Sequence, residues 1–351
     1  MRRSRLPRER VAAFAPGRVN LIGEHTDYNG GLALPFAIAQ GITVRAERRD
    51  EARLRARALD LDEHDSFALE DRSRARGWRA FVRGTVAELT DAGFPPVGAR
   101  LEIGGDLARG AGLSSSAALE VALCLALLAL RDSVEALDEV EIARLCARVE
   151  SNWVGAQTGL LDQLASLCGQ PDSALLIDFA ELTVEPVPLR LGQWRLVLVD
   201  SGERHAHATS GYNRRRAECA RACELMGIRS LRAARVEQAE RLPEPLRARV
   251  RHVLGENERV VAAVAALRAN DLLALGELLD ASHRSLRDCY AVSTAAVERT
   301  VHDLLRAGAV GARMMGGGFG GSVLALFAPS VATPEGAREV RAAAGAHLLG
   351  R

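Results

Sequence analysis

Residues 17–31 read GRVNLIGEHTDYNGG and place many polar side chains between glycines. This is more hydrogen-bonding capacity than a transition from strand to loop needs. Each hydroxyl of a sugar both donates and accepts, so a site that selects one stereoisomer needs carboxylates, with an imidazole and a phenol alongside. The run therefore predicts a site for a polyhydroxylated ligand; the alternative is a polar hairpin held by its own Asx and glycine turns. The polar members are Arg18, Asn20, Glu24, His25, Thr26, Asp27, Tyr28 and Asn29.

The length of the chain predicts two lobes. Its 351 residues exceed the roughly 250 to 300 at which a single core stops growing. A stretch containing Pro186 and Pro188 is the candidate boundary, which divides the chain into residues 1–187 and 188–351. The net charge of +1, without long blocks of one sign, argues against nucleic acid or an acidic membrane as the main partner.

All 46 basic residues are arginine. The chain therefore cannot use a Walker A lysine, the strand lysine of protein kinases or a Schiff-base lysine. Any phosphate site must be built from backbone amides, hydroxyls, a metal ion and arginine.

The cysteines and the apolar runs predict a reduced, cytoplasmic protein. The six cysteines are scattered through apolar or helical stretches, and no second Cys/His pair joins Cys219 and Cys223 to complete a zinc set. No apolar h-region follows the charged N-terminus, and no run of about 18 apolar residues is present. We therefore expect no membrane partner.

Strand and helix patterns alternate along the chain. The periodicity predicts helices over residues 78–93, 112–132 and 141–155, the second of them apolar all round and hence buried. Further helices, rich in arginine, are expected between about 212 and 288. The expected strands lie at 11–23, 42–49, 66–70, 99–107, within 173–189, near 194–202 and after 321.

The segment GAGLSSSA, residues 110–117, has the chemistry of a phosphate loop. Its glycines allow close backbone approach, and its serines stand at the start of a long helix, where unpaired amides and the helix dipole attract anions. The alternative for a serine at this place is an ordinary N-cap.

Three further segments carry candidate chemistry. Two carboxylates twelve residues apart, Glu150 and Asp162, could divide phosphoryl transfer between a magnesium ligand and a group at the substrate hydroxyl. Tyr212 precedes Arg214–Arg216, which are expected to pair with acids on a surface helix. The glycines of GGGFGG, residues 316–321, contain a GxGxxG, but a strand-like segment follows, so a dinucleotide fold is rejected.

Together these motifs resemble the galactokinases of the galactokinase, homoserine kinase, mevalonate kinase and phosphomevalonate kinase (GHMP) superfamily. The resemblance covers residues 14 to about 327 and is most specific in residues 17–31. It implies a two-lobed α/β (α+β) fold: an N-terminal lobe like the second domain of ribosomal protein S5 and a ferredoxin-like C-terminal lobe. It also implies ATP-dependent phosphorylation of the anomeric hydroxyl of galactose, with the site between the lobes. Ala108 stands where the family usually has a proline before the phosphate loop, and we expect it to loosen the approach to that loop without abolishing binding. The departures at Cys289 and Met314–Met315 are expected to affect packing and not the chemistry.

The resemblance also implies roles for individual residues. Asp162 and Arg18 are the catalytic pair; Tyr290 is given a structural role. Trp78 lies near the adenine, or else is an ordinary core tryptophan. The sugar contacts are Glu24, His25, Asp27, Gly159 and Tyr212. The ATP phosphates are bound by Gly110, Gly112, Leu113, Ser114, Ser115 and Ser116, and Mg²⁺ by Ser116 and Glu150.

Three alternatives remain at this point. A related kinase could phosphorylate N-acetylgalactosamine or arabinose at the same position. A catalytically silent protein could sense galactose and ATP, although the serine loop and both carboxylates are intact. A nucleic-acid-binding module could use the arginines of residues 204–251, but acidic residues are interleaved there.

Overall fold

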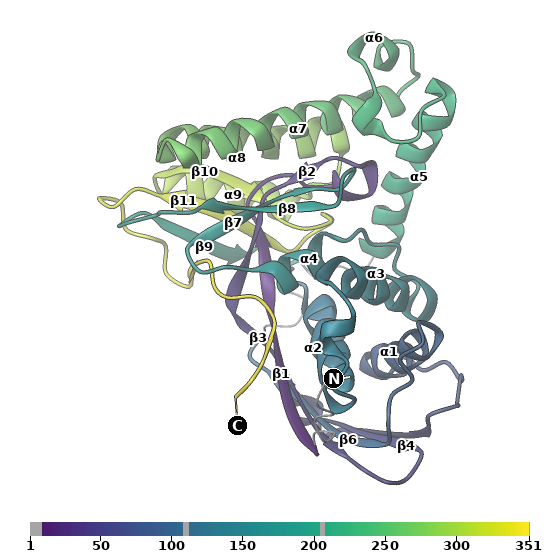
Figure 1. Cartoon of the computed structure of the whole chain (residues 1–351). Coiled ribbons are helices and arrows are strands. Elements are labelled where there is room, and N and C mark those ends of the chain that lie inside the picture. The colour runs from purple at the N-terminus through teal and green to yellow at the C-terminus, as the bar shows by residue number, and fades with distance from the viewer. Residues whose placement is uncertain (1–8, 108–111, 204–207, 351) are drawn as a thin grey trace.

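The computed structural model describes residues 9–107, 112–203 and 208–350. Figure 1 shows two parts, one built around β1, β3, α1 and α2 and the other around β9–β11 and α7–α9. The long strands β1 and β3 run from the first part toward the second (Figure 1).

The first part is built on a six-stranded sheet in the order β13-β1-β3-β6-β4-β5, antiparallel except between β4 and β6. A register shift between Pro16 and Arg18 interrupts the pairing of β1 with β3. Such bulges re-aim side chains, here next to Arg18. The strands are β1 (Arg10–Asn20), β3 (Pro35–Arg48), β4 (Arg53–Ala58), β5 (Glu63–Ala68), β6 (Ala99–Gly105) and β13 (His347–Leu348).

The helices beside this sheet follow from local sequence signals. The central helix is apolar on every side, and its residues from Ala117 to Leu130 are all buried against β1 and β3 and neighbouring helices. The next helix along the chain begins with a capping box between Asp138 and Glu141. The helices are α1 (Trp78–Asp91), α2 (Ser115–Leu130), α3 (Glu139–Val149), the π-helical turn η4 (Glu150–Val154) and α4 (Leu161–Cys168).

The second part has a four-stranded antiparallel sheet in the order β10-β11-β9-β12. A small sheet, β2-β7-β8, lies near it, as Figure 1 shows. The strands are β2 (Leu32–Ala33), β7 (Ser173–Asp178), β8 (Thr183–Pro188), β9 (Arg195–Asp200), β10 (Ala309–Met314), β11 (Ser322–Phe327) and β12 (Arg338–Val340). The helices are α5 (Ala208–Met226), α6 (Val236–Ala239), α7 (Leu246–Arg268), α8 (Leu272–Ser285), the π-helical turn η6 (Leu286–Tyr290) and α9 (Ala295–Arg306).

One large hydrophobic cluster extends through both parts. It joins Leu101 of the first sheet and Leu123 of α2 to Val260 of α7, Leu279 of α8 and Leu324 of β11. Strand β13, near residue 350, pairs with β1 of the first sheet. Pro186 and Pro188 lie inside β8 of the small sheet, and the next strand, β9, belongs to the four-stranded sheet. The division into 1–187 and 188–351 stays a prediction.

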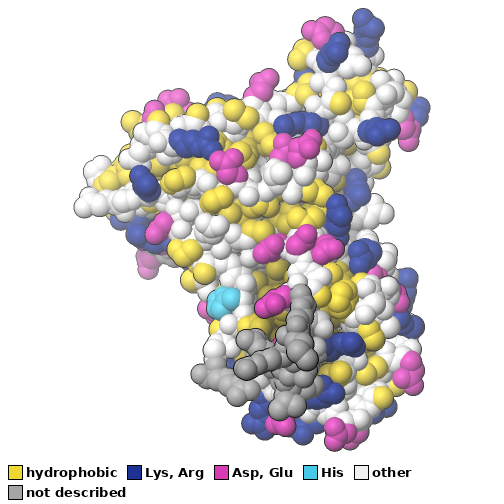
Figure 2. All heavy atoms as spheres, viewed as in Figure 1, with side chains coloured by type: hydrophobic (Ala, Val, Ile, Leu, Met, Phe, Trp, Pro, Cys, Tyr) yellow, Lys and Arg dark blue, Asp and Glu magenta, His cyan; other side chains and the backbone are white. Residues whose placement is uncertain are grey.

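The strand after GGGFGG is present as β11, as expected. The predicted third helix differs, because it begins at Glu139 and changes to a π-helical turn at Glu150. On the face seen in Figure 2, basic and acidic side chains are interspersed and neither sign forms a continuous area. None of the helices in the described residues has the length and apolar character needed to cross a membrane.

Candidate active site

Arg18 of β1 and Asp162 of α4 form an ion pair. Nε of Arg18 donates to Oδ1 of Asp162 at 2.7 Å, and Nη2 lies 2.6 Å from the same oxygen. Nη1 donates at 2.7 Å to the carbonyl of Gly112. The Arg18 side chain is only 7% exposed. The guanidinium thus connects the Asp162 carboxylate with the segment that precedes α2.

Ser114 stands at the start of α2 but does not cap it with its side chain. Its backbone is left-handed (φ 56°), and its hydroxyl donates to Oδ2 of Asp162. The first amides of a helix lack intrahelical partners and favour anions. The serine therefore orients the carboxylate, while the N-terminus of α2 keeps its attraction for negative charge.

The other predicted phosphate-binding residues lie close by where they are described. Leu113 is buried, and its carbonyl accepts from the amide of Arg18 at 3.2 Å. Gly112 has a φ of 72°. Ser115 begins α2, and Ser116 follows it. Gly110 lies outside the described residues.

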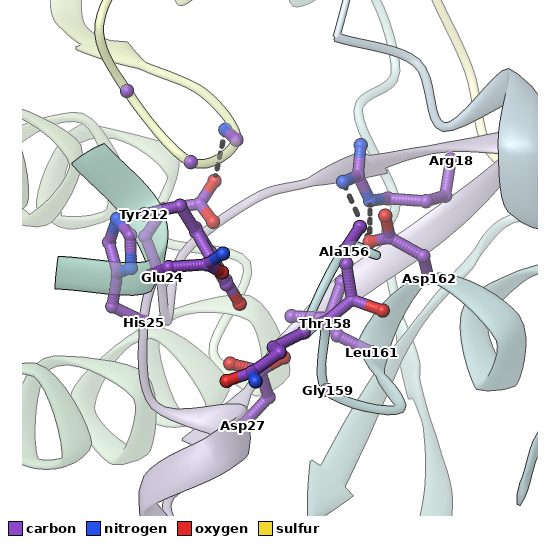
Figure 3. Close-up of a pocket in the computed structure, with 15 residues that line it drawn as sticks. Arg18, Glu24, His25, Asp27, Ala156, Thr158, Gly159, Leu161, Asp162 and Tyr212 are labelled. Atoms are coloured by element: carbon purple, nitrogen blue, oxygen red, sulfur yellow. Dashed lines mark hydrogen bonds and ion pairs between the residues drawn. The ribbon is translucent and has the colours of Figure 1, made fainter. Parts of the chain in front are cut away.

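A pocket of about 300 Å³ opens beside Asp162 (Figure 3). Its walls come from the end of β1, the segment before α4, α5 and the glycine loop of residues 316–318. All seven predicted catalytic and sugar-binding residues line it: Arg18, Glu24, His25, Asp27, Gly159, Asp162 and Tyr212. The structure brings these residues together, and their roles stay predictions.

The carboxylates of this pocket are held by neighbouring groups. Oε1 of Glu24 accepts from the amide of Gly316 at 2.8 Å and lies 3.3 Å from Nη2 of Arg313. Burial raises the pKa of Asp27 to about 7. A Cβ at Gly159 would lie 1.9 Å from Oδ2 of Asp27, so any larger residue there would force the Asp27 side chain to move. The pocket therefore holds its own hydrogen-bond acceptors at fixed places.

His25 is neutral and surrounded by rings. Burial, with help from nearby His252 and Arg215, lowers its pKa to about 3. Its ring centroid lies 5.3 Å from that of Tyr212. Its left-handed backbone (φ 62°) is held by Asn29, whose side-chain amide donates to the His25 carbonyl at 2.7 Å.

A second cavity, of about 550 Å³, lies beside the start of α2 and includes Trp78, Ser115 and Ser116 in its lining. The Trp78 ring is half-buried and packs at the edge of the core, and its Nε1 donates to Glu63 at 2.7 Å. This tryptophan lines a cavity instead of being enclosed in the core. Its predicted contact with adenine stays a prediction.

Glu150 lies behind the serine loop and is 4% exposed. Thr158 donates to its Oε2, Gln163 does so at 3.2 Å, and Ser116 is a further hydrogen-bond partner. Burial raises the pKa of Glu150. Among the described residues no group of three or more His, Cys, Asp or Glu side chains could hold a metal ion. Mg²⁺ needs only one or two carboxylate or hydroxyl ligands when phosphates and waters supply the rest, and Ser116 with Glu150 fits that pattern.

The sequence did not predict the contacts of several residues at the site. Arg214 pairs with Glu218 on the surface, as expected. Arg215 also pairs with Glu218, at 3.0 Å, but it is buried and not on the surface, and Arg216 donates to a backbone carbonyl and, within the described residues, not to an acid. Arg215 is buried and donates to the carbonyls of Tyr290 and Ala291. Arg216 donates at 2.6 Å to the carbonyl of Gln157, in the segment that precedes Gly159. No short-range signal separates these three arginines, because the carbonyls that bind Arg215 and Arg216 are distant in sequence.

Glu120 is another residue that the sequence did not single out. It is fully buried in α2, and burial beside Glu150 raises its pKa well above the usual value. A carboxyl group in this environment is protonated. In the sequence it looks like one polar residue within an apolar helix.

Three family models match the chain. The galactokinase galactose-binding signature matches residues 3–48, the GHMP kinases N terminal domain residues 80–170, and the GHMP kinases C terminal model residues 263–348. A Mycobacterium tuberculosis protein named galactokinase is 44% identical over 323 residues, which cover 90% of this chain and 88% of that protein. A Roseiflexus galactokinase is 43% identical over 329 residues, 90% of this chain and 83% of its own length.

The chain belongs to the galactokinase family. The galactokinase of Lactococcus lactis, solved in complex with galactose, has a TM-score of 0.89 at 31% identity and covers 97% of this chain and 95% of its own. Mevalonate kinase of L. major has the same fold, with a TM-score of 0.65 at 22% identity over 93% and 91% of the two chains. The predicted GHMP fold and the predicted class of enzyme, a sugar kinase, are confirmed for this galactokinase-family chain.

Proposed function

We propose that this chain transfers the terminal phosphoryl group of ATP to the anomeric hydroxyl of galactose, giving galactose 1-phosphate. The observation that carries the proposal is the position of Asp162. Its carboxylate lines the sugar-side pocket, while one of its oxygens accepts from Ser114 at the start of α2. A group that reaches both an acceptor sugar and a phosphate-binding helix end is what phosphoryl transfer requires.

Asp162 and Arg18 divide the chemistry. The carboxylate accepts or orients the proton of the anomeric hydroxyl, and the guanidinium stabilises the charge that develops on the transferring group. Their ion pair, at 2.6 Å, fixes both before any ligand arrives. Glu24, His25, Asp27 and Tyr212 bind the remaining hydroxyls, and Gly159 leaves room for Asp27.

The second cavity takes the nucleotide. Its phosphates approach the N-terminus of α2, and the half-buried ring of Trp78 lies against the adenine. Ser116 and Glu150 hold Mg²⁺, which neutralises charge on the phosphates when bound. Galactose and ATP are the partners of a cytoplasmic enzyme that uses neither nucleic acid nor a membrane.

A coupled ATP-consumption assay over a dozen monosaccharides tests the function. We expect turnover with galactose, and ³¹P and ¹³C spectra of the product should place the phosphate at C1. A product phosphorylated at C6, or turnover only with N-acetylgalactosamine or arabinose, contradicts the proposal. Binding of galactose and ATP without turnover would favour a sensor.

A further inference from the structure

All three tyrosines of the chain surround one histidine. The ring centroids of Tyr28, Tyr212 and Tyr290 lie 6.0, 5.3 and 4.6 Å from that of His25. Only Tyr212 among these tyrosines lines the pocket of Figure 3. Tyr28 and Tyr290 are not in its lining, so we look for a function other than direct contact with a ligand in the pocket.

These two tyrosines form a chain of hydrogen bonds that ends at the imidazole. Nδ1 of His25 is 2.9 Å from the hydroxyl of Tyr28, which is 2.9 Å from the hydroxyl of Tyr290. The Tyr290 hydroxyl in turn lies 3.0 Å from Sγ of Cys219. Burial raises the pKa of Tyr28 and of Tyr290 well above the usual value, so both phenols keep their protons.

The other ring nitrogen of His25 is left for a ligand. Nε2 is buried and has no hydrogen-bond partner within the described residues. A neutral imidazole carries one N–H, so the partner of Nδ1 decides whether Nε2 donates or accepts. The hydrogen-bond chain therefore determines what the sugar meets at this atom.

Two observations favour a donating Nε2. A phenol, with a pKa of about 10, is a far stronger acid than a neutral imidazole N–H, so Tyr28 donates to Nδ1 more readily than it accepts from it. At the far end, the Cys219 sulfur is a weak acceptor, which favours protons directed toward His25.

We propose that Tyr28 and Tyr290 are positioning residues that fix His25 as the Nε2–H tautomer, so that its imidazole donates a hydrogen bond to one hydroxyl oxygen of the sugar. This inference rests on the proposed function for its ligand. The sugar hydroxyl that accepts from Nε2 must direct its own proton to another acceptor, and the carboxylates of Glu24 and Asp27 line the same pocket. A sugar that lacks this hydroxyl leaves the N–H unpaired and is rejected.

The tautomer is measured on sugar-free protein labelled with ¹⁵N-histidine. Two-bond nitrogen–proton spectra distinguish protonated Nε2 from protonated Nδ1, and His25→Asn assigns the His25 signals. We expect Nε2–H in the parent and a mixture of tautomers in Tyr28→Phe. A parent protonated at Nδ1, or a Tyr28→Phe variant with unchanged signals, overturns the proposal. Because no substrate is present, this outcome is independent of the proposed function.

Kinetics with galactose give the second readout. Tyr28→Phe should raise the KM for galactose about tenfold, which corresponds to about 1.4 kcal/mol, with kcat within twofold of the parent. His25→Asn tolerates the left-handed backbone and has no atom at the place of Nε2. In that background Tyr28→Phe should add nothing; additive effects would mean that Tyr28 does not act through His25.

Matched variants test the order of the residues along the hydrogen-bond chain. Tyr290→Phe should shift the KM less than Tyr28→Phe, and Cys219→Ala less again. Cys223→Ala, one turn further along α5, is the control that leaves the KM unchanged. Equal effects of Cys219→Ala and Cys223→Ala, or a larger effect of Tyr290→Phe, contradict the order. If the parent fails to phosphorylate galactose, the proposed function fails while the tautomer result stands.

Discussion

The sugar-side pocket and the second cavity differ in how far their polar groups are already fixed. The sugar-side pocket measures about 300 Å³, and its lining comes from four segments spread between residues 18 and 318. Arg18 and Asp162 pair with each other, Glu24 is bound by Gly316, and Asp27 fits against Gly159. The second cavity measures about 550 Å³ and draws on residues between 42 and 119 only.

The proposed ligands of the two cavities account for this difference. Selecting one sugar requires fixed donors and acceptors, because an unpaired hydroxyl costs binding energy. Triphosphate binding depends more on a metal ion and backbone amides, which tolerate a wider cavity. Substitutions should therefore separate the two cavities, with larger effects on the sugar side.

The largest effect is expected for Asp162→Asn. Loss of a positioned base costs about 10²- to 10⁴-fold in rate, so turnover should fall by at least that order. The amide keeps the size of the side chain, and galactose should still bind through Glu24, His25, Asp27 and Tyr212. Calorimetry alongside steady-state kinetics separates binding from turnover. Turnover within a few-fold of the parent would mean that Asp162 does not act at the reacting hydroxyl.

Gly159→Ala should disable the sugar side alone. The new methyl group would lie 1.9 Å from Oδ2 of Asp27, so the carboxylate has to move. We expect galactose affinity to fall by about 100-fold, the loss of roughly two charged hydrogen bonds. ATP affinity and thermal stability serve as controls. An unchanged galactose affinity would show that Asp27 does not bind the sugar.

Glu150→Gln should change the magnesium requirement. The variant keeps one oxygen that can accept from Thr158 and Gln163 and loses the charge, so half-maximal activity should need about tenfold more Mg²⁺. Ser116→Ala should act in the same direction, and galactose binding should stay as in the parent. A normal magnesium titration in both variants would mean that the ion is held elsewhere.

Asp27→Asn tests the raised pKa through stability. The unfolded carboxyl releases its proton near pH 3.8, whereas the folded one holds it to about pH 7, so the parent loses stability as pH rises between these values. At about 1.36 kcal/mol per pKa unit, discounted for partial exposure, the loss is about 2 kcal/mol. In urea unfolding, the free energy of unfolding of the variant should therefore rise relative to that of the parent between pH 4 and pH 8. A pH-independent difference would argue for an ordinary pKa.

Trp78→Phe should have the smallest effect. The variant keeps an aromatic surface and loses the hydrogen bond to Glu63, which is worth about 1 kcal/mol. The KM for ATP should therefore rise about fivefold or less, with no change in the KM for galactose. A shift in the galactose KM instead would place Trp78 outside the nucleotide site.

Much of the site could be predicted from contiguous motifs. Residues 17–31, the segment that ends at Asp162 and the segment around Tyr212 supply the predicted sugar-side residues, and the buried α2 could be expected from its apolar sequence. The roles of Arg215, Arg216 and Glu120 could not, because they depend on partners far away in sequence. Ser114 illustrates the same limit, since its hydroxyl reaches Asp162, 48 residues further along the chain, instead of capping its own helix. Local propensity predicts the helices and strands, whereas contacts between residues distant in sequence determine the role of each side chain.

The hydrophobic cluster shared by the two parts restricts how the protein can move. Leu101 and Leu123 belong to the same cluster as Val260 and Leu324, so swinging one part away from the other would expose apolar surface. A wide hinge opening is therefore costly, and unfolding should be cooperative across both parts. We expect ligand entry to need at most the movement of short segments, such as the glycine loop of residues 316–318 that borders the sugar pocket. Substrate access then becomes a matter of local loop excursions within a rigid frame.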